Sequence, residues 1–226
     1  MHILASCPFT CVRLKWNPEA RGETFDLIRQ FRGALGAHFV ETDLFHQHTP
    51  NGKFAYRYPR VQYRWENGAG LVLGWETAAR VLPDLPWLDV SARLGGRQAQ
   101  VEEAVIVVGT GEFSVTDRLV RYRLLTPLLL FNQENYRKYR ELPVNERDVE
   151  CDRLLVAQVL SALRGLDILF PERLYAAFVS RKTKLCTYKA QSLLGMEGTI
   201  VTNAGLPNGF GIGHAVSHGY GWMQRT

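Results

Sequence analysis

The feature that most restricts the fold is a pair of strands predicted between residues 60 and 75. Residues 60–65 alternate strictly, with the apolar side chains of Val61, Tyr63 and Trp65 on one face and polar side chains on the other. This alternation is typical of a half-buried strand. The turn Glu66-Asn-Gly-Ala leads into a second apolar strand at 70–75. The segment therefore predicts an antiparallel hairpin.

The elements around the hairpin complete a β-α-β-β-α-β order in the first half of the chain. Residues 3–16 are rich in β-branched and aromatic side chains and predict a strand. Residues 24–39 predict a helix, because apolar side chains recur there at three- and four-residue spacing. A short helix at 77–82 and strands through 88–108 follow.

The second half repeats this order. Strand-rich residues 113–130 precede a linker rich in Arg, Tyr and Glu, and residues 152–166 then predict a helix. Strands are expected at 175–188 and 198–202. We therefore predict an α+β protein with two tandem ferredoxin-like (RRM-like) β-α-β-β-α-β domains, at 1–111 and 112–226, the second carrying a C-terminal glycine-rich loop.

That loop spans residues 209–221, and Gly211, Gly213, Gly219 and Gly221 give it the pattern G-x-G, five residues, G-x-G. Paired glycines permit positive φ and close backbone approach, and successive N–H groups in such a loop can bind an anion such as a phosphate. The spacing fits neither the dinucleotide fingerprint nor the Walker loop. A tight turn without ligand is the alternative.

Charge and composition restrict the partners. The net charge is +5, and residues 112–226 carry 15 basic and 11 acidic residues against 12 and 11 in residues 1–111. The excess favours a polyanionic partner. No apolar run approaches the roughly 18 residues that span a bilayer, and the N-terminus does not resemble a signal peptide. We expect a cytoplasmic protein that does not bind a membrane.

The four cysteines do not predict a metal site. Cys7, Cys11, Cys151 and Cys186 lack the two closely spaced pairs of a zinc site. Reduced and mostly buried thiols are the expectation, with no metal and no cofactor.

Basic side chains on two elements are candidates for binding nucleic acid. Lys182, Lys184 and Tyr188 share one face of the 175–188 strand, which suits a nucleic-acid backbone and its bases. A solvated edge strand protected by lysines is the alternative. Arg29 and Arg32 share a stripe of the 24–39 helix.

Several stretches together resemble the CRISPR-associated repeat-RNA processing endoribonucleases, the Cas family numbered six, of the RAMP superfamily. They extend across nearly the whole chain, and the spacing of the glycine loop is the most specific of them. The similar segments are Phe31-Arg-Gly-Ala-Leu-Gly36, His46-Gln-His48, Tyr56-Arg-Tyr-Pro-Arg-Val-Gln-Tyr63, Thr126-Pro-Leu, Asp152-Arg-Leu-Leu and Thr202-Asn-Ala-Gly-Leu-Pro-Asn-Gly-Phe-Gly-Ile-Gly213.

The resemblance implies binding of CRISPR repeat RNA and its cleavage without a metal. A 2′-hydroxyl would attack the adjacent phosphate and leave a cyclic phosphate and a 5′-hydroxyl. It implies His48 as general base, His46 as general acid or RNA orienter, and Tyr56 and Lys53 as groups that steady the phosphate, with Tyr58 as the alternative tyrosine. Histidine suits proton transfer near neutral pH.

One departure from the family pattern leaves alternatives open. Glycine loops of the family usually hold a Lys or Arg in the five-residue insert, and here the insert is His214-Ala-Val-Ser-His218. Either backbone amides and Ser217 contact the RNA, or His214 or His218 takes part in the chemistry. A non-catalytic RNA-binding subunit of a CRISPR effector is the alternative function, and a small-molecule phosphate enzyme is a third. Other effector subunits and a second copy of the chain are open partners.

Overall fold

The computed structural model describes residues 1–45, 58–189 and 191–226, and the chain divides into two compact units. We call residues 7–110 with 217–219 the N-terminal unit, and residues 1–6, 111–216 and 220–226 the C-terminal unit. The predicted boundary after residue 111 stays a prediction. Residues 109–112 lie within one continuous strand, β5 (Arg97–Leu124), and not in a loop.

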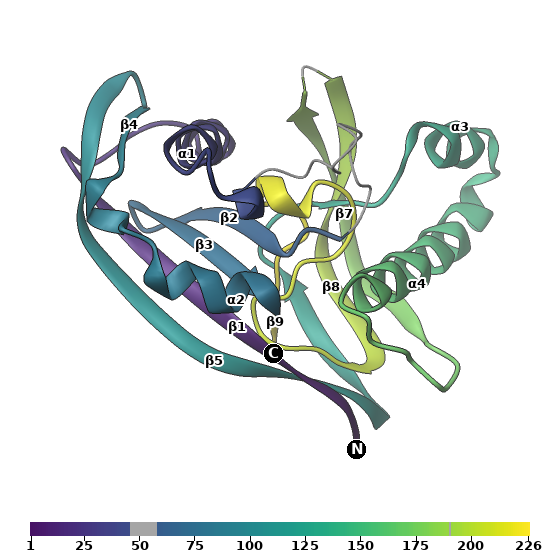
Figure 1. Cartoon of the computed structure of the whole chain (residues 1–226). Coiled ribbons are helices and arrows are strands. Elements are labelled where there is room, and N and C mark those ends of the chain that lie inside the picture. Colours follow the sequence, from purple (N-terminus) through teal and green to yellow (C-terminus); the bar gives the residue numbers. More distant parts are fainter. Residues whose placement is uncertain (46–57, 190) are drawn as a thin grey trace. The chain divides into compact units, whose positions relative to one another are not determined.

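The N-terminal unit contains an antiparallel sheet with strand order β2-β3-β1-β5, and β4 pairs with the start of β5 (Figure 1). This order, with α1 between the first two strands and α2 after the third, is the ferredoxin-like arrangement predicted from the sequence. The elements are β1 (His2–Asn17), α1 (Thr24–His38), β2 (Val61–Glu66), β3 (Ala69–Trp75), α2 (Thr77–Val81) and β4 (Ser91–Leu94), with short 3₁₀ turns at Asp43–Phe45, Leu82–Asp84 and Trp87–Asp89.

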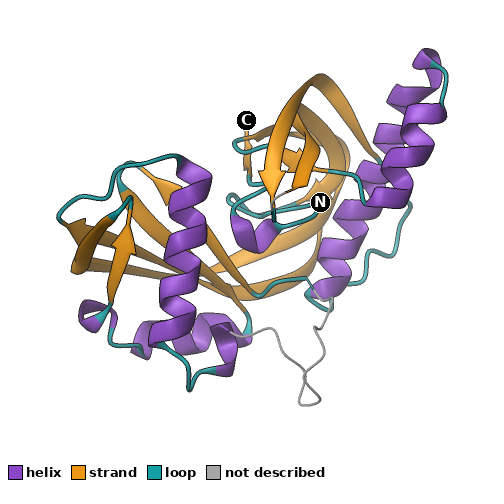
Figure 2. Ribbon diagram, turned by 90° about the horizontal axis from the view of Figure 1, so that it is seen from above, coloured by secondary structure: helices purple, strands orange, loops and turns teal. Residues whose placement is uncertain are grey.

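The predicted hairpin and the predicted helix are both confirmed. Glu66 pairs with Ala69 across a two-residue turn, in which Asn67 and Gly68 both have positive φ, as a type I′ hairpin turn requires. Helix α1 begins at a cap in which the Glu23 carboxylate accepts the N–H groups of Phe25 and Asp26. The helix lies over the sheet (Figures 1 and 2), and the apolar side chains of Leu27, Ile28, Phe31 and Leu35 are buried.

Strand β2 is buried on both faces, so the prediction of a half-buried strand was wrong. Gln62 and Arg64, on the face predicted to meet solvent, are buried. Their polar groups are satisfied in a chain of contacts: Arg64 Nη2 donates to Gln62 Oε1 at 3.2 Å, and Gln62 Nε2 donates to the Tyr58 hydroxyl at 2.9 Å. Desolvation lowers the pKa of Arg64 to about 9.

The C-terminal unit has the same strand arrangement, with order β9-β5-β8-β7 and β6 also pairing with β8. Residues 206–222, all of them described, form no second α-helix: the glycine-rich segment and a 3₁₀ turn at Val216–His218, η5, connect β8 to β9. The elements after β5 are β6 (Leu128–Leu129), α3 (Gln133–Glu141), α4 (Arg147–Gly165), β7 (Ala176–Tyr188), β8 (Gln191–Gly205) and β9 (Met223–Arg225). A 3₁₀ turn at Val144–Glu146 leads into α4, which lies beside the strands of its unit (Figure 2).

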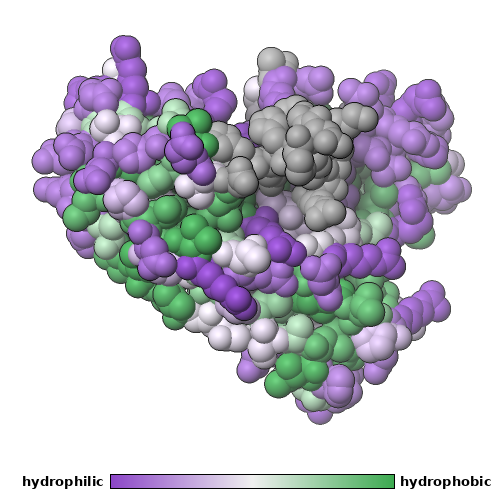
Figure 3. Space-filling model, in the orientation of Figure 1, coloured by the Kyte–Doolittle hydropathy of each residue, from purple (hydrophilic) through white to green (hydrophobic). Residues whose placement is uncertain are grey.

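Three elements of this unit differ from the prediction. The expected linker is helix α3, which begins at an Asn132 cap that accepts the N–H of Asn135. Only Tyr139 of this helix is buried, and Figure 3 shows the helix as a cluster of hydrophilic side chains. Strand β8 begins seven residues earlier than expected, at Gln191, because it pairs with β7 along its length. Strand β9 was not predicted.

The four cysteines are free thiols, and all but the half-buried Cys11 are buried, as expected. None of the helices in the described part of the chain is long and apolar enough to cross a membrane.

Tyr122 holds the chain in place where β8 ends and the glycine-rich segment begins. Removing its hydroxyl tests how much this contact stabilises the fold. The hydroxyl accepts the Leu206 N–H at 2.7 Å, and both residues are buried. Tyr122→Phe leaves that N–H without its partner, so we expect a loss of about 1–3 kcal/mol in the free energy of unfolding, measured in urea. Tyr136→Phe, on a side chain that is 38% exposed, should change it by less than about 0.5 kcal/mol. Equal losses in the two variants would contradict this role.

Candidate nucleic-acid interface

Much of the backbone of the glycine-rich segment is hydrogen-bonded to protein. Six N–H groups between residues 209 and 223 donate to main-chain carbonyl oxygens at 2.9–3.3 Å. They therefore cannot also bind a phosphate. The pairs, donor first, are Gly209 with Met223, Phe210 with Pro207, Met223 with Phe210, Ile212 with Gly221, Gly221 with Pro127, and His214 with Leu129.

Two of the predicted glycines are required because protein surrounds them. Gly221 has φ +68°, and a Cβ there would lie 1.8 Å from the carbonyl oxygen of Ile212. Gly213 has φ +91°, and its Cβ would lie 2.9 Å from the carbonyl oxygen of Leu129. No side chain fits either position, so both glycines allow the segment to close on its own unit. Gly211 is buried and bridges to Trp222.

The five-residue insert, His214–His218, is where the segment opens to solvent. Val216 is buried and anchors it, whereas His214, Ser217 and His218 are half-buried. Ala215 has φ +57°, directly before the 3₁₀ turn. A phosphate contact by this segment would therefore be made by the insert rather than by its flanking glycines.

His214 lies against helix α4 of the same unit. Its Nε2 is 3.2 Å from Nε2 of Gln158, which also donates to the carbonyl oxygen of Leu130 at 3.3 Å. Burial lowers the pKa of His214, so the imidazole is neutral near pH 7. A neutral and half-buried imidazole is a poor substitute for the Lys or Arg expected in the insert.

The part of the glycine-rich segment assigned to the N-terminal unit, Ser217–Gly219, lies beside α1. A Cβ at Gly219 would lie 2.6 Å from Cδ1 of Ile28 and 3.2 Å from the carbonyl oxygen of Tyr63. Burial raises the pKa of Tyr63, and the nearby Arg32 guanidinium opposes that change. Within this unit the structure thus gathers Arg32, Tyr63 and Ser217–Gly219. Arg29 points elsewhere, to an exposed ion pair with Asp26 at 2.8 Å.

Strand β7 contributes the predicted basic face of the C-terminal unit. Lys182 and Lys184 are exposed, and Lys184 pairs with Glu197 at 2.9 Å. Tyr188 meets Tyr220 of the glycine-rich segment edge to face, with ring centroids 6.4 Å apart. The Tyr220 hydroxyl donates to the Thr187 carbonyl oxygen at 3.0 Å. The structure therefore joins the aromatic end of the basic strand to the glycine-rich segment.

Three residues of this arrangement were missed by the sequence analysis. Lys189 lies over the Tyr188 ring at 5.5 Å, Tyr220 holds the segment to β7, and Gln158 holds His214. Lys189 and Tyr220 could have been found, because one follows the predicted Tyr188 and the other lies between two predicted glycines. Nothing in the sequence connects Gln158 with a residue 56 positions later.

The predicted catalytic residues His46, His48, Lys53 and Tyr56 lie outside the described residues. The chain is described again from Tyr58, whose hydroxyl accepts from Gln62. Within residues 1–45, 58–189 and 191–226, no three His, Cys, Asp or Glu side chains are placed to hold a metal ion.

Comparison with known proteins identifies similar domains in both halves. A family model described as the Cas6b N-terminal domain matches residues 12–111, and one described as the Cas6b C-terminal domain matches residues 114–226. An uncharacterized protein of Methanocaldococcus jannaschii is 30% identical over 133 residues, which cover 59% of this chain and 90% of that protein.

Solved structures show the same fold. A crystal structure of Cas6b matches with a TM-score of 0.87 and 21% identity, over 98% of this chain and all of that one. A crystal structure of the CRISPR RNA processing endoribonuclease Cas6b matches with a TM-score of 0.76 and 19% identity, over the same shares.

The contact between His214 and Gln158 predicts a pH dependence of stability. The pKa of His214 is lowered in the folded protein, so the unfolded chain binds more protons as the pH falls below about 6.5. The contribution of His214 is therefore complete above that pH and is lost as the pH falls towards the folded-state pKa. We expect His214→Gln, which cannot be protonated, to lose less stability than the wild type between about pH 6.5 and pH 5. Urea unfolding at several pH values in this range measures the free energy of unfolding of both proteins. If that free energy falls equally with pH in the two proteins, His214 does not contribute.

Proposed function

The chain belongs to the Cas6b family, and on this premise we propose that it is an endoribonuclease that cleaves CRISPR repeat RNA to release guide RNAs. The observation that carries the proposal is that Cas6b domain models match both halves of the chain, 12–111 and 114–226. The fold agrees with it, as does the solved structure of a CRISPR RNA processing endoribonuclease with which this chain aligns over 98% of its length.

The proposed chemistry is attack by a 2′-hydroxyl on the adjacent phosphate without a metal, giving a 2′,3′-cyclic phosphate and a 5′-hydroxyl. This reaction needs a base for the hydroxyl proton, an acid for the leaving oxygen and a donor for the phosphate charge. His48 as base, His46 as acid or RNA orienter, and Tyr56 and Lys53 at the phosphate would supply these groups. The insert histidine His214 is less suited to acid catalysis, because burial lowers its pKa.

The proposed RNA contacts are given for each unit separately. In the C-terminal unit, Lys182, Lys184 and the stacked pair of Lys189 and Tyr188 present positive charge and an aromatic ring, which suits phosphates and an unpaired base. In the N-terminal unit, Arg32 lies near Tyr63, beside which Ser217–Gly219 is placed. The RNA is the proposed partner, while binding to other effector subunits, homodimer formation and a cytoplasmic location are separate predictions.

Cleavage in excess EDTA tests the chemistry directly. We expect the wild type to cut its CRISPR repeat RNA with EDTA present, and His48→Ala to cut at least about 10²-fold more slowly, the usual size of an acid–base contribution. His38→Ala is the matched control, since His38 is an exposed histidine on α1 that lies outside the predicted catalytic loop. A 2′-deoxy nucleotide at the scissile position should abolish cutting.

Other outcomes would redirect the proposal. Cutting that survives in His48→Ala would move the base to His46 or to the insert histidines. Tight RNA binding without any cutting by the wild type would identify a non-catalytic RNA-binding subunit. Unchanged cutting of the 2′-deoxy substrate would refute attack by the 2′-hydroxyl.

The salt dependence of RNA binding tests the basic face of β7. For each lysine that contacts a phosphate, removal should reduce the slope of log K against log[salt] by about one. Lys182→Ala/Lys184→Ala should therefore weaken binding and flatten the slope by about two, as measured by fluorescence anisotropy. Lys138→Ala is the control, because Lys138 pairs with Glu134 on α3 much as Lys184 pairs with Glu197. An unchanged slope of log K against log[salt] in the double variant would show that the two lysines do not contact phosphates, and that β7 is a solvated edge strand.

A further inference from the structure

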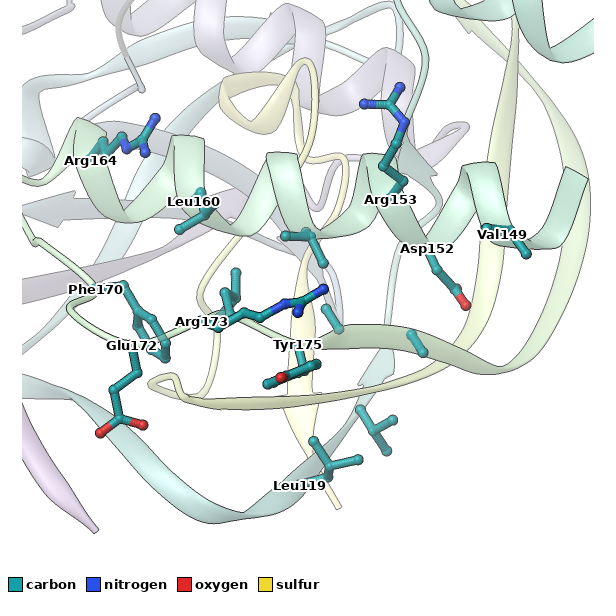
Figure 4. A pocket seen from close by; sticks show the side chains of 15 residues that line it. Leu119, Val149, Asp152, Arg153, Leu160, Arg164, Phe170, Glu172, Arg173 and Tyr175 are labelled. Atoms are coloured by element: carbon teal, nitrogen blue, oxygen red, sulfur yellow. The ribbon is translucent and has the colours of Figure 1, made fainter. Parts of the chain in front are cut away.

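A groove with a volume of about 800 Å³ follows helix α4 on the side away from Gln158. Figure 4 shows the helix along one wall, with Tyr175 at the start of β7 facing it and Leu119 beyond. All residues that line the groove belong to the C-terminal unit. The apolar part of the lining includes Leu119, Val149, Val156, Leu160, Phe170 and Tyr175.

Helix α4 has a second apolar stripe that faces this groove. Its first stripe is the buried one against the sheet, which includes Leu155 and Val159. Val149, Val156 and Leu160 follow at spacings of seven and four, so they lie along one side of the helix. None of the three is buried, and Val149 is 70% exposed. A helix that carries two apolar stripes has a second surface to cover.

The exposed apolar side chains around the groove form a cluster. Leu119 is 58% exposed and Tyr175 is 52% exposed, and both line the groove together with Val149. Single exposed apolar residues are common, but a contiguous group along a groove indicates an interaction site. No segment of residues 1–45, 58–189 or 191–226 covers this group.

The lining holds three arginines and two acidic side chains, and the contacts of each decide which charge is available to a partner. Arg153 is neutralised by Glu150, to which it donates twice at 2.6 Å, and Asp152 accepts the Phe178 N–H at 2.9 Å. The Arg173 guanidinium lies over the Tyr175 ring at 5.4 Å. Among the described residues, Arg164 and Arg173 have no ion-pair partner.

Glu172 is the remaining acid of the lining. Figure 4 shows Arg173 directed between α4 and Tyr175, and Glu172 directed away from them. The groove thus presents an available guanidinium within an apolar surface, which complements a carboxylate on a partner.

We infer that this groove docks an amphipathic, acidic helical segment of another protein. Apolar side chains of the segment would fill the space beside Val149, Val156 and Leu160, and an acidic side chain would bind Arg173. From Val149 to Arg164 the wall is about 22 Å long, at 1.5 Å per residue, which a partner helix of about 15 residues matches.

The lining favours a peptide over RNA. Aliphatic side chains dominate the walls, and they offer bases no surface for stacking. The lining has two rings, Phe170 and Tyr175, and the Arg173 guanidinium already lies over the Tyr175 ring. Docking in this groove does not depend on RNA cleavage, so either can fail without the other.

Binding of designed peptides to the full chain tests the inference. The probe is a fluorescent 15-residue helical peptide with leucines at a and d heptad positions and glutamates elsewhere, and its pair has lysines in place of the glutamates. We expect the acidic peptide to bind at least about tenfold more tightly than the lysine peptide, by anisotropy. Hydrogen exchange should show protection of residues 149–164 by the acidic peptide.

Three variants localise the binding. Val149→Asp should weaken binding of the acidic peptide about tenfold or more, since it places a charge in the exposed end of the groove. Val144→Asp is the matched control, because Val144 is 78% exposed and lies outside the groove. Arg173→Ala should remove most of the preference for the acidic peptide. Thermal unfolding verifies that each variant folds, and RNA cleavage should be unchanged in all three.

Several outcomes would overturn the inference. Equal binding of the two peptides, or binding of neither, would exclude an acidic helical partner. Weaker binding of single-stranded RNA in Val149→Asp but not in Val144→Asp would assign the groove to RNA. Concentration-dependent dimerisation in sedimentation that Val149→Asp abolishes would assign it to a second copy of the chain.

Discussion

The closure of the glycine-rich segment on its own unit is the constraint from which the rest of the site follows. A Cβ at Gly221 would lie 1.8 Å from the carbonyl oxygen of Ile212, so only glycine allows these two strands of the loop to pair. The pairing uses the N–H groups of Ile212, His214 and Gly221 on protein carbonyls. A loop whose glycine pattern predicts phosphate binding is therefore first a closed structural turn, and the polar side chains of its insert are half-buried.

Because the segment is closed in this way, the positive charge that binds RNA has to lie on residues outside it. The insert contains no Lys or Arg, and His214 is neutral because burial against α4 lowers its pKa. The nearby charge lies instead on β7 and the residue after it, which Tyr188 and Tyr220 join to the glycine-rich segment. The departure from the family pattern in the insert is thus compatible with an RNA-binding surface whose cations lie on the neighbouring strand.

The sequence predicted the elements whose local pattern is strong and missed features set by distant contacts. Strict alternation identified the hairpin at β2 and β3, but not the burial of Arg64, which depends on what covers the second face of the sheet. The sequence of helix α3 was interpreted as a linker, although its Glu, Lys and Arg residues favour a helix. The helix buries only Tyr139, so it has no apolar face that the sequence pattern could reveal. The neutral state of His214 follows from its position beside α4, whose Gln158 lies far away in the sequence. The proposed roles of His46 and His48 as acid and base rest on the resemblance to the family. Their chemistry depends on spatial neighbours that the sequence does not reveal.

Helix α4 connects the two surfaces of the C-terminal unit. Gln158 contacts His214 on one side of the helix, and Leu160, two residues later, lines the groove on another. Residues two apart on a helix point in different directions, so a partner in the groove does not occupy the side of α4 on which His214 lies. Such a partner still contacts the helix that holds the insert. Any effect of docking on RNA affinity must then be matched by an equal effect of RNA on docking, because coupling between two binding sites is reciprocal.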